Sequence, residues 1–277
     1  MVTSPRGSWA REPRTVVLNK VDSPTSVPDP FAIVVESAFV SVPLEFEPHA
    51  HPLHELVWMR GGTMTVRLAD SVITVPEGQG LWIPAGTLHS GRTTARASLF
   101  DALFDPERSP VAFAEAIAVD VTPVVAALLT HLERADLTEA ARVRAEAVVF
   151  DVLEPAGRQL ALRVPHAERI GPIVDALVQD PTDDRSLREW AQAVGASERT
   201  IARQFRTHTG LSFLQWRQSL RVHHALTLLG EGLAVQEVSE QLGYSQASTF
   251  IASFKRVMGL TPGAYTPQMA ETLYRVS

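Results

Sequence analysis

The chain has 277 residues, 45% of them hydrophobic and 20% charged, which is an ordinary composition for a globular protein of about two domains. No apolar run approaches the ~18 residues that cross a bilayer, and the N-terminal MVTSPRGSWAREPR lacks the layout of a secretory signal. With no cysteine, the chain has neither a disulfide framework nor a thiolate metal site. These features predict a cytoplasmic protein.

The charge is unevenly shared along the chain. The formal net charge is −6, yet residues 185–266 hold nine Lys or Arg against five Glu and no Asp, a local charge of +4. The remaining residues therefore carry −10 (−6 minus +4). A basic segment joined to an acidic body is typical of a nucleic-acid-binding module attached to another domain.

The first 121 residues predict an arm followed by short strands. Residues 1–30 are rich in Pro, Ser, Thr and Arg and predict a flexible arm. Residues 31–121 then alternate β-type runs with Gly, Pro and Asp turns, as in FAIVVESAFV, HELVWMR and ASLFDALF. Short, regularly punctuated strands predict a sandwich or barrel.

From residue 122 the pattern becomes helical. TPVVAALLTHLERA and TEAARVRAEAVVFDVLEPAG each begin at a threonine suited to capping a helix. We expect residues 122–165 to form a helical linker or dimerisation segment. Its apolar stripe pairs two copies of the chain or covers the barrel, and it comprises Val124, Val125, Leu128, Leu129 and Leu132.

The C-terminal part contains an internal repeat. LREWAQAVGASERTIARQF and, 48 residues further on, VQEVSEQLGYSQASTFIASF each read as an apolar helix, a glycine turn and a second helix. This layout is that of a helix-turn-helix, although apolar spacing alone is equally typical of an all-α bundle. In the first copy, Arg199, Arg203 and Arg206 avoid the apolar stripe and offer a cationic face for phosphates and guanine edges.

The last ~100 residues resemble the DNA-binding domain of the AraC/XylS family of transcription regulators. The resemblance rests on Arg217, Arg221, Ala225, Leu228-Leu229, Gly243-Tyr244-Ser245, Ser248, Phe250, Phe254-Lys255-Arg256, Gly259-Leu260-Thr261-Pro262 and Tyr265. It implies two motifs that enter successive major grooves of double-stranded DNA. The implied DNA-binding residues are Ser197, Arg199, Thr200, Arg203, Arg206, Gln246, Ala247, Ser248, Thr249, Lys255 and Arg256.

Two positions depart from the family pattern. Ala252 and Thr266 stand where arginine is common. With few side chains that can hydrogen-bond to bases, the second motif is expected to hold the DNA backbone, while the first motif reads most of the sequence.

The stretch HAHPLHE, from His49 to Glu55, carries the chemistry of the first half. His49 and His51 are two residues apart, so on a strand they share one face, whereas His54 has the opposite parity and is predicted to pack or to face solvent. With GQGLWIPAGTLH, from Gly78, the stretch resembles the two motifs of a cupin barrel. It departs from them at Thr93, where asparagine is frequent, and in lacking the opening glycine of the first motif.

The cupin resemblance implies a divalent transition metal, Zn, Fe, Mn, Co or Ni, on His49, His51, Glu55 and His89. Three interpretations compete: a metal-loaded sensor, a metal-free pocket for an organic effector, and a metal-dependent enzyme such as a dioxygenase or isomerase. Trp58 and Trp82 are candidates to line an effector pocket. The other histidines lack partners at ligand spacing and are predicted to be structural; they are His131, His166, His208, His223 and His224.

We therefore expect a multi-domain protein, with an N-terminal all-β cupin barrel (double-stranded β-helix) at 31–121 and a C-terminal all-α domain with two helix-turn-helix motifs at 166–277. Its predicted function is sequence-specific transcription regulation without catalysis. Its predicted partners are promoter DNA, a small-molecule or metal effector and a second copy of the chain, but no membrane. The alternative is a cupin metalloenzyme with a helical scaffold.

Overall fold

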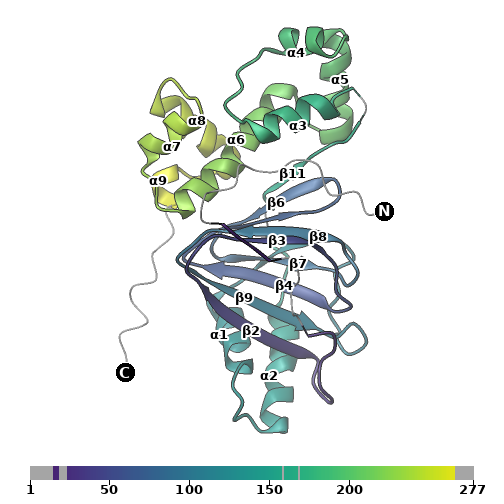
Figure 1. Cartoon of the computed structure of the whole chain (residues 1–277). Coiled ribbons are helices and arrows are strands. Elements are labelled where there is room, and N and C mark those ends of the chain that lie inside the picture. The colour runs from purple at the N-terminus through teal and green to yellow at the C-terminus, as the bar shows by residue number, and fades with distance from the viewer. Residues whose placement is uncertain (1–14, 19–23, 158, 168, 266–277) are drawn as a thin grey trace. The chain divides into compact units, whose positions relative to one another are not determined.

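The structure is a computed structural model that describes residues 15–18, 24–157, 159–167 and 169–265 (Figure 1). The chain forms two compact units. The strand unit comprises the described residues up to Leu68 and from Val75 to Leu160. The helical unit comprises Ala69–Thr74 and the described residues from Ala161 onward.

The strand unit contains two β-sheets, which confirms the predicted β-rich N-terminal domain. One sheet has the order β1-β3-β8-β5 within this unit, and the other has the order β10-β7-β4-β9-β2. Most of these strands fall in the apolar runs that the sequence predicts as strands. Their bounds are β1 Val16–Leu18, β2 Ile33–Val40, β3 Leu44–His49, β4 His54–Arg60, β5 Met64–Arg67, β7 Gln79–Ile83, β8 His89–Thr93, β9 Ala97–Phe104 and β10 Ile117–Asp120.

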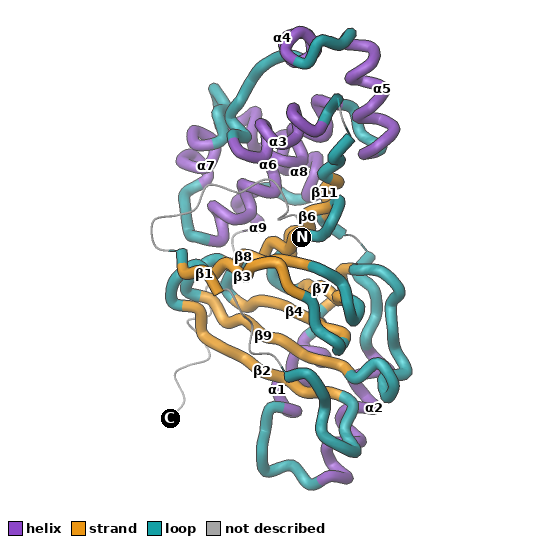
Figure 2. Tube along the Cα trace, turned by 45° about the vertical axis from the view of Figure 1, so that its right-hand side comes forward, coloured by secondary structure: helices purple, strands orange, loops and turns teal. Residues whose placement is uncertain are grey.

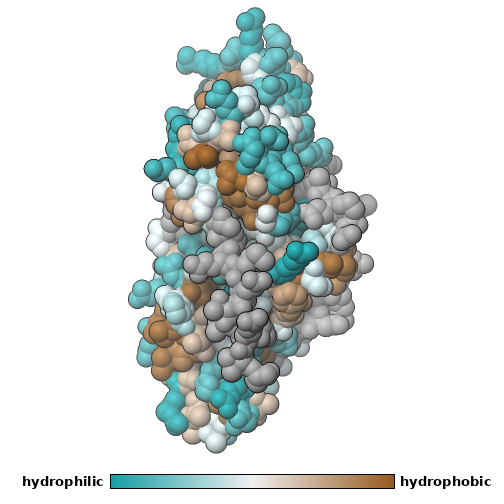
Figure 3. All heavy atoms as spheres, turned by 90° about the vertical axis from the view of Figure 1, so that its left-hand side faces the viewer, coloured by the Kyte–Doolittle hydropathy of each residue, from teal (hydrophilic) through white to brown (hydrophobic). Residues whose placement is uncertain are grey.

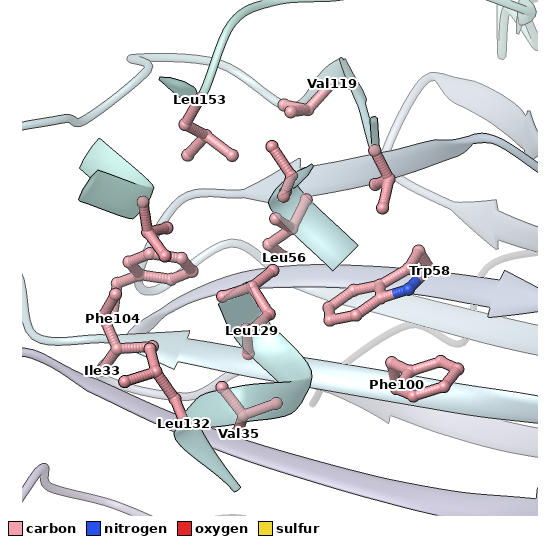
Figure 4. Packing of buried hydrophobic residues seen from close by; sticks show 14 of the residues in the cluster. Ile33, Val35, Leu56, Trp58, Phe100, Phe104, Val119, Leu129, Leu132 and Leu153 are labelled. Atoms are coloured by element: carbon pink, nitrogen blue, oxygen red, sulfur yellow. The ribbon is translucent and has the colours of Figure 1, made fainter. Parts of the chain in front are cut away.

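Two helices pack on the outer face of the second sheet. They are α1 (Pro123–Leu132) and α2 (Glu139–Val152), and their N-termini are capped by Thr122 and Thr138 as the sequence predicts. Leu129 and Leu132 of α1 lie among Leu56, Trp58 and Phe104 of the sheet (Figure 4). Most of the predicted apolar stripe of α1 therefore covers this sheet, whereas Val124 stays exposed.

Part of the expected flexible arm is ordered instead. Residues 16–18 form β1, which pairs in parallel with β3. Val27 is buried against Leu53 and Leu103, and the guanidinium of Arg108 donates to its carbonyl oxygen at 2.8 Å. The prediction of a flexible segment over residues 1–30 is therefore wrong for residues 16–18 and Val27. The mainly polar composition of the segment gave no sign that Val27 is buried. Residues 1–14 and 19–23 lie outside the described residues.

The helical unit is built around one long helix. Its helices are α3 Gly171–Gln179, α4 Leu187–Ala193, α5 Glu198–Thr209, α6 Phe213–Gly230, α7 Val235–Gln241, α8 Ala247–Met258 and α9 Pro262–Tyr265 (Figure 2). Between the α4–α5 pair and the α7–α8 pair runs α6, the linking helix that the sequence predicts.

Two short strands belong to the core of this helical unit. β11 (Ala161–Arg163) pairs antiparallel with β6 (Ser71–Val75), and Val72 and Leu162 pack into one cluster with Trp216. The indole nitrogen of Trp216 donates to the carbonyl oxygen of Arg163 at 2.7 Å. Residues 69–74 were expected in the barrel and residues 161–165 in a helical linker. Both segments join the helical unit because their apolar side chains complete its core.

A buried polar contact joins β6 to α6 inside the helical unit. The Oγ1 of Thr74 lies 2.6 Å from the Nδ1 of His223, and the two residues are 1% and 3% exposed. Burial lowers the pKa of His223 to about 4, so the imidazole is neutral near pH 7.

None of the helices in the described part of the chain is long and apolar enough to cross a membrane. On the face shown in Figure 3, hydrophobic residues form separate groups among hydrophilic ones. The exposed large hydrophobic residues include Phe39, Val124, Val143, Val148 and Leu214.

Candidate metal centre and DNA-binding surface

Three histidines converge in the strand unit as predicted. His49 at the end of β3 lies opposite His89 at the start of β8, next to a register shift between Phe46 and His49. His51 follows in the loop before β4. Each ring offers one nitrogen as a ligand, and these three nitrogens all lie within 4.8 Å of one another. This is the arrangement of a candidate metal site.

The backbone fixes the orientation of all three rings. The Nδ1 of His49 lies 2.7 Å from the carbonyl oxygen of Glu47, that of His51 lies 2.7 Å from Leu53 O, and that of His89 lies 2.9 Å from Thr87 O. Since a carbonyl oxygen only accepts, each Nδ1 must carry the hydrogen. The Nε2 atom of each neutral ring then presents a lone pair, which is the form that binds a metal ion.

Glu55 lies beside two of these imidazoles. Its Oε2 is 3.1 Å from the Nε2 of His51 and 3.2 Å from the Nε2 of His89, and the residue is 8% exposed. Burial alone would raise the pKa of Glu55, but the Nε2 atoms of His51 and His89, which donate to the carboxylate when they are protonated, lower it to about 2. A carboxylate facing two lone pairs is favourable only when a cation, a proton or a metal ion, lies between them.

The histidine pKa values follow from the same geometry. Burial lowers the pKa of His49, and the neighbouring His89 lowers it further. Burial also opposes protonation of His51, but its hydrogen bond to Glu55 and the charge of that carboxylate leave its pKa raised. The pKa values of His49 and His51 thus shift in opposite directions because, of these two rings, His51 is the one that contacts the carboxylate of Glu55.

Asp101 is a member of this site that the sequence motifs did not reveal. It lies on β9 opposite Glu36 of β2, and burial together with the charges of Glu55 and Glu36 raises its pKa well above the ordinary value. Burial and these charges therefore favour the protonated form of Asp101, which is a hydrogen-bond donor beside the carboxylate of Glu55. An aspartate inside the apolar strand ASLFDALF was the available signal.

The structure places Trp58 and Trp82 in the hydrophobic core rather than in the cluster of His49, His51 and His89. Both tryptophans belong to the hydrophobic cluster that α1 and α2 cover, and Trp58 stacks on Phe100 with ring centroids 4.9 Å apart. Glu55 alternates with Leu56 along β4 and faces the other side of the sheet. The expectation that these tryptophans line a pocket with the histidine cluster is thereby corrected, because strand parity assigns them to the core.

His54 packs as expected from its parity. Its ring lies 5.1 Å from that of Trp82, and its Nδ1 accepts a hydrogen bond from the amide of Ala85 at 3.0 Å. In the helical unit, His166 lies 3.2 Å from the carbonyl oxygen of Ala69 and His223 binds Thr74. Both contacts fit the structural role predicted for these two histidines.

The first helix-turn-helix consists of α4 and α5. Ser186 begins α4 with a capping box closed by Glu189, and Ser197 caps α5 by accepting the amide hydrogen of Thr200. Ile201 and Phe205 are fully buried. The side chains of Arg199, Arg203 and Arg206 are exposed, so the cationic face predicted from the sequence is present on α5.

The second helix-turn-helix consists of α7 and α8. Gln246 stands at the N-cap of α8 without a side-chain capping bond, while Phe250 and Phe254 are fully buried. Its exposed side chains are Ser248, Thr249, Ala252, Lys255 and Arg256, so both of its cations lie in the second half of the helix, whereas α5 carries two cations in its first half. The guanidinium of Arg256 also donates to Gln218 of α6 at 3.1 Å, so this cation ties α8 to the linking helix.

A unit of two β-sheets together with two helix-turn-helix motifs on one linking helix is the layout of a DNA-binding transcription regulator. A helix-turn-helix domain model matches residues 190–268, and a model of the AraC-like ligand binding domain matches residues 44–119. The chain is 32% identical over 225 residues to the HTH-type transcriptional regulator NimR of Escherichia coli K12, covering 80% of this chain and 82% of that protein. The protein belongs to the AraC family of transcription regulators.

A second relative has the same kind of function. The chain is 28% identical to the HTH-type transcriptional regulator RipA of Corynebacterium diphtheriae over 215 residues, which cover 77% of this chain and 61% of that protein. Among solved structures, ToxT of Vibrio cholerae aligns over 87% of this chain and 99% of its own with 12% identity and a TM-score of 0.37. The family and the named relatives are transcription regulators rather than enzymes, so the metalloenzyme alternative is set aside.

Proposed function

We propose that the strand unit senses a divalent transition metal, or an effector bound through that metal, by means of His49, His51 and His89, with Glu55 as the fourth ligand. The observation that carries this proposal is the shared orientation of the three rings, whose Nδ1 atoms are held by backbone carbonyls. These contacts leave the Nε2 of each ring as the nitrogen available to a metal ion. Zn, Fe, Mn, Co and Ni all suit such nitrogen and oxygen donors. Metal titration tests the proposal.

A metal-free pocket for an organic effector is the second candidate. The pair of Asp101 and Glu55 favours it, because burial and the charge of Glu55 raise the pKa of Asp101, and a protonated Asp101 beside an ionised Glu55 offers one donor and several acceptors in a buried place. An effector that hydrogen-bonds both groups would then need no metal. Effector binding that survives complete chelation would support this candidate over the first.

In the helical unit, the first motif is proposed to read most of the operator. Arg199 and Arg203 lie exposed in the first two turns of α5, and the matching positions of α8 are Ser248 and Ala252. Ser197 and Thr200 are proposed to bind phosphate through the N-terminus of α5. We expect further contacts, mainly with the DNA backbone, from Arg206, Gln246, Ala247, Thr249, Lys255 and Arg256. Such a protein would act in the cytoplasm.

Arg203→Ala is expected to weaken operator binding by about 1–3 kcal/mol and to relax base preference at one position, because a bidentate guanine contact is lost. Gel-shift titration against operator variants measures both effects. Lys255→Ala is the matched control, since it also removes one exposed cation from a recognition helix. The control should weaken all operators alike. Unchanged base preference in Arg203→Ala would contradict the assignment.

The outer faces of α1 and α2 are proposed to pair two copies of the chain. Val125, Leu129 and Leu132 already cover the barrel, yet Val124 remains 56% exposed and Val148 42% exposed. Apolar side chains left over after the core is filled are typical of an association surface.

Val143→Glu combined with Val148→Glu is expected to raise the dimer dissociation constant at least about tenfold, because an uncompensated carboxylate resists burial. Analytical ultracentrifugation over a concentration series measures the change. Leu214→Glu, which alters an exposed leucine of the helical unit, serves as the control and should leave association unchanged. A monomeric wild-type protein would refute the pairing.

A further inference from the structure

The two helix-turn-helix motifs share a second connection besides α6. It is the loop of residues 180–186 between α3 and α4, and Arg221 near the middle of α6 binds it. The Nε of Arg221 donates to the carbonyl oxygen of Pro181 at 2.7 Å, and its Nη2 lies 3.2 Å from Thr182 O and 3.4 Å from Asp183 O. The guanidinium of Arg221 thus donates to the carbonyl oxygens of three consecutive residues.

This loop is rigidly attached to the first motif. Asp183 accepts two hydrogen bonds from the guanidinium of Arg185, at 2.9 Å from Nε and 2.5 Å from Nη2. The same guanidinium lies 3.5 Å from the ring centroid of Trp190, a buried residue of α4. Ser186 ends the loop and caps α4. The carbonyls that Arg221 binds are therefore fixed with respect to the first motif.

The other side of Arg221 faces the second motif. Its guanidinium carbon lies 5.3 Å from the ring centroid of Tyr244, which follows α7 and packs 5.5 Å from the ring of Phe250 in α8. The preceding Gly243 also lies close to the loop, since a Cβ atom there would come within 3.3 Å of the Thr182 Cβ. At φ +72°, glycine is suited to this turn both by its backbone conformation and by the lack of a side chain.

We propose that Arg221 is a positioning residue that sets the spacing between the two recognition helices, α5 and α8, and thereby the operator spacing that the protein accepts. A helix alone bends over its length, whereas a planar guanidinium with three acceptors and an aromatic partner holds both motifs at once. Arg221 is partly buried at this junction and needs no contact with DNA for this role.

The test compares operators that differ only in spacing. An operator is first selected from random duplex DNA with the wild-type protein, and one base pair is then inserted between the two subsites. The insertion moves the second groove by roughly 3.4 Å and 35°, given about ten base pairs per turn. We expect the wild-type protein to lose at least about tenfold in affinity and Arg221→Ala to lose less than about threefold, because its second motif can follow the shifted groove.

Arg217→Ala is the matched control. Arg217 donates to the carbonyl oxygen of Arg185 in the same loop at 2.9 Å, but its ring partner is Phe213, at the start of α6, rather than Tyr244. This variant should keep the wild-type spacing preference even if its thermal stability falls. If Arg221→Ala bound both operators more weakly than the wild-type protein by the same factor, Arg221 would be only a general stabiliser and the proposal would be overturned. A wild-type protein that bound both operators equally well would also overturn it.

A second pair of variants tests the same junction from the other side. Tyr244→Leu removes the ring that faces Arg221, whereas Tyr244→Phe keeps the ring and loses only the hydroxyl bond to Ser253, at 3.3 Å. The leucine variant is expected to tolerate the inserted base pair, and the phenylalanine variant to reject it. If Arg221→Ala does not fold, this pair decides the question, and identical spacing preference in both variants would overturn the proposal.

Discussion

His51→Ala is expected to abolish stoichiometric metal binding. The wild-type protein should hold about one divalent transition metal per chain, because three imidazoles and a carboxylate form a nearly complete first shell. Loss of a second-shell partner alone costs roughly 10–100-fold in metal affinity, so loss of a ligand should cost at least about 100-fold. Elemental analysis of protein from metal-replete medium, followed by competition titration with a chelator, measures the change.

His54→Ala provides the matched control for this experiment. His54 is three residues further along the same stretch, but it contacts Trp82 and Ala85 rather than the cluster. The control should keep its metal, while both variants should still bind operator DNA because the DNA-binding residues lie in the other unit. Metal affinity should fall as the pH is lowered, since protons compete for the imidazoles. Equal metal content in His51→Ala and wild-type protein would contradict the site.

The helical unit is expected to lose stability on acidification between pH 6.5 and about 4. In the folded protein burial holds the pKa of His223 at about 4, below its ordinary value of 6.5, so the unfolded chain takes up the proton first. The stabilising contribution is thus complete above pH 6.5 and disappears as the pH falls toward 4. At about 1.36 kcal/mol per pKa unit, this one group accounts for up to roughly 3 kcal/mol.

His223→Gln should flatten this dependence while retaining a polar partner for Thr74. Denaturant unfolding at pH 7 and pH 5, followed by the fluorescence of Trp190 and Trp216 in a background where the other tryptophans are replaced by phenylalanine, compares the variant with the unsubstituted His223 protein. His208→Gln replaces an exposed histidine of α5 and should keep the wild-type slope. If His223→Gln loses as much stability on acidification as the wild-type protein, His223 is not the responsible group.

The sequence by itself determined the helix-turn-helix motifs and the histidine cluster. Ile201 and Phe205 repeat at helical spacing, and a glycine turn precedes each recognition helix, so local periodicity was sufficient. His49 and His51 follow the two-residue alternation of a strand, and the cupin resemblance supplied Glu55 and His89. These signals are local in the chain, and they led to both the fold class and the family.

Only the tertiary structure decided which distant segments pack together. Nothing near Val72 or Leu162 in the sequence indicates that they complete the core of the helical unit, because the pairing of β6 with β11 joins residues about 90 positions apart. Strand register places Asp101 near the histidine cluster, and strand parity places Trp58 on the opposite face of the sheet, in the hydrophobic core. Register and burial are fixed by non-local packing, since a slip of one residue exchanges the two faces of a strand.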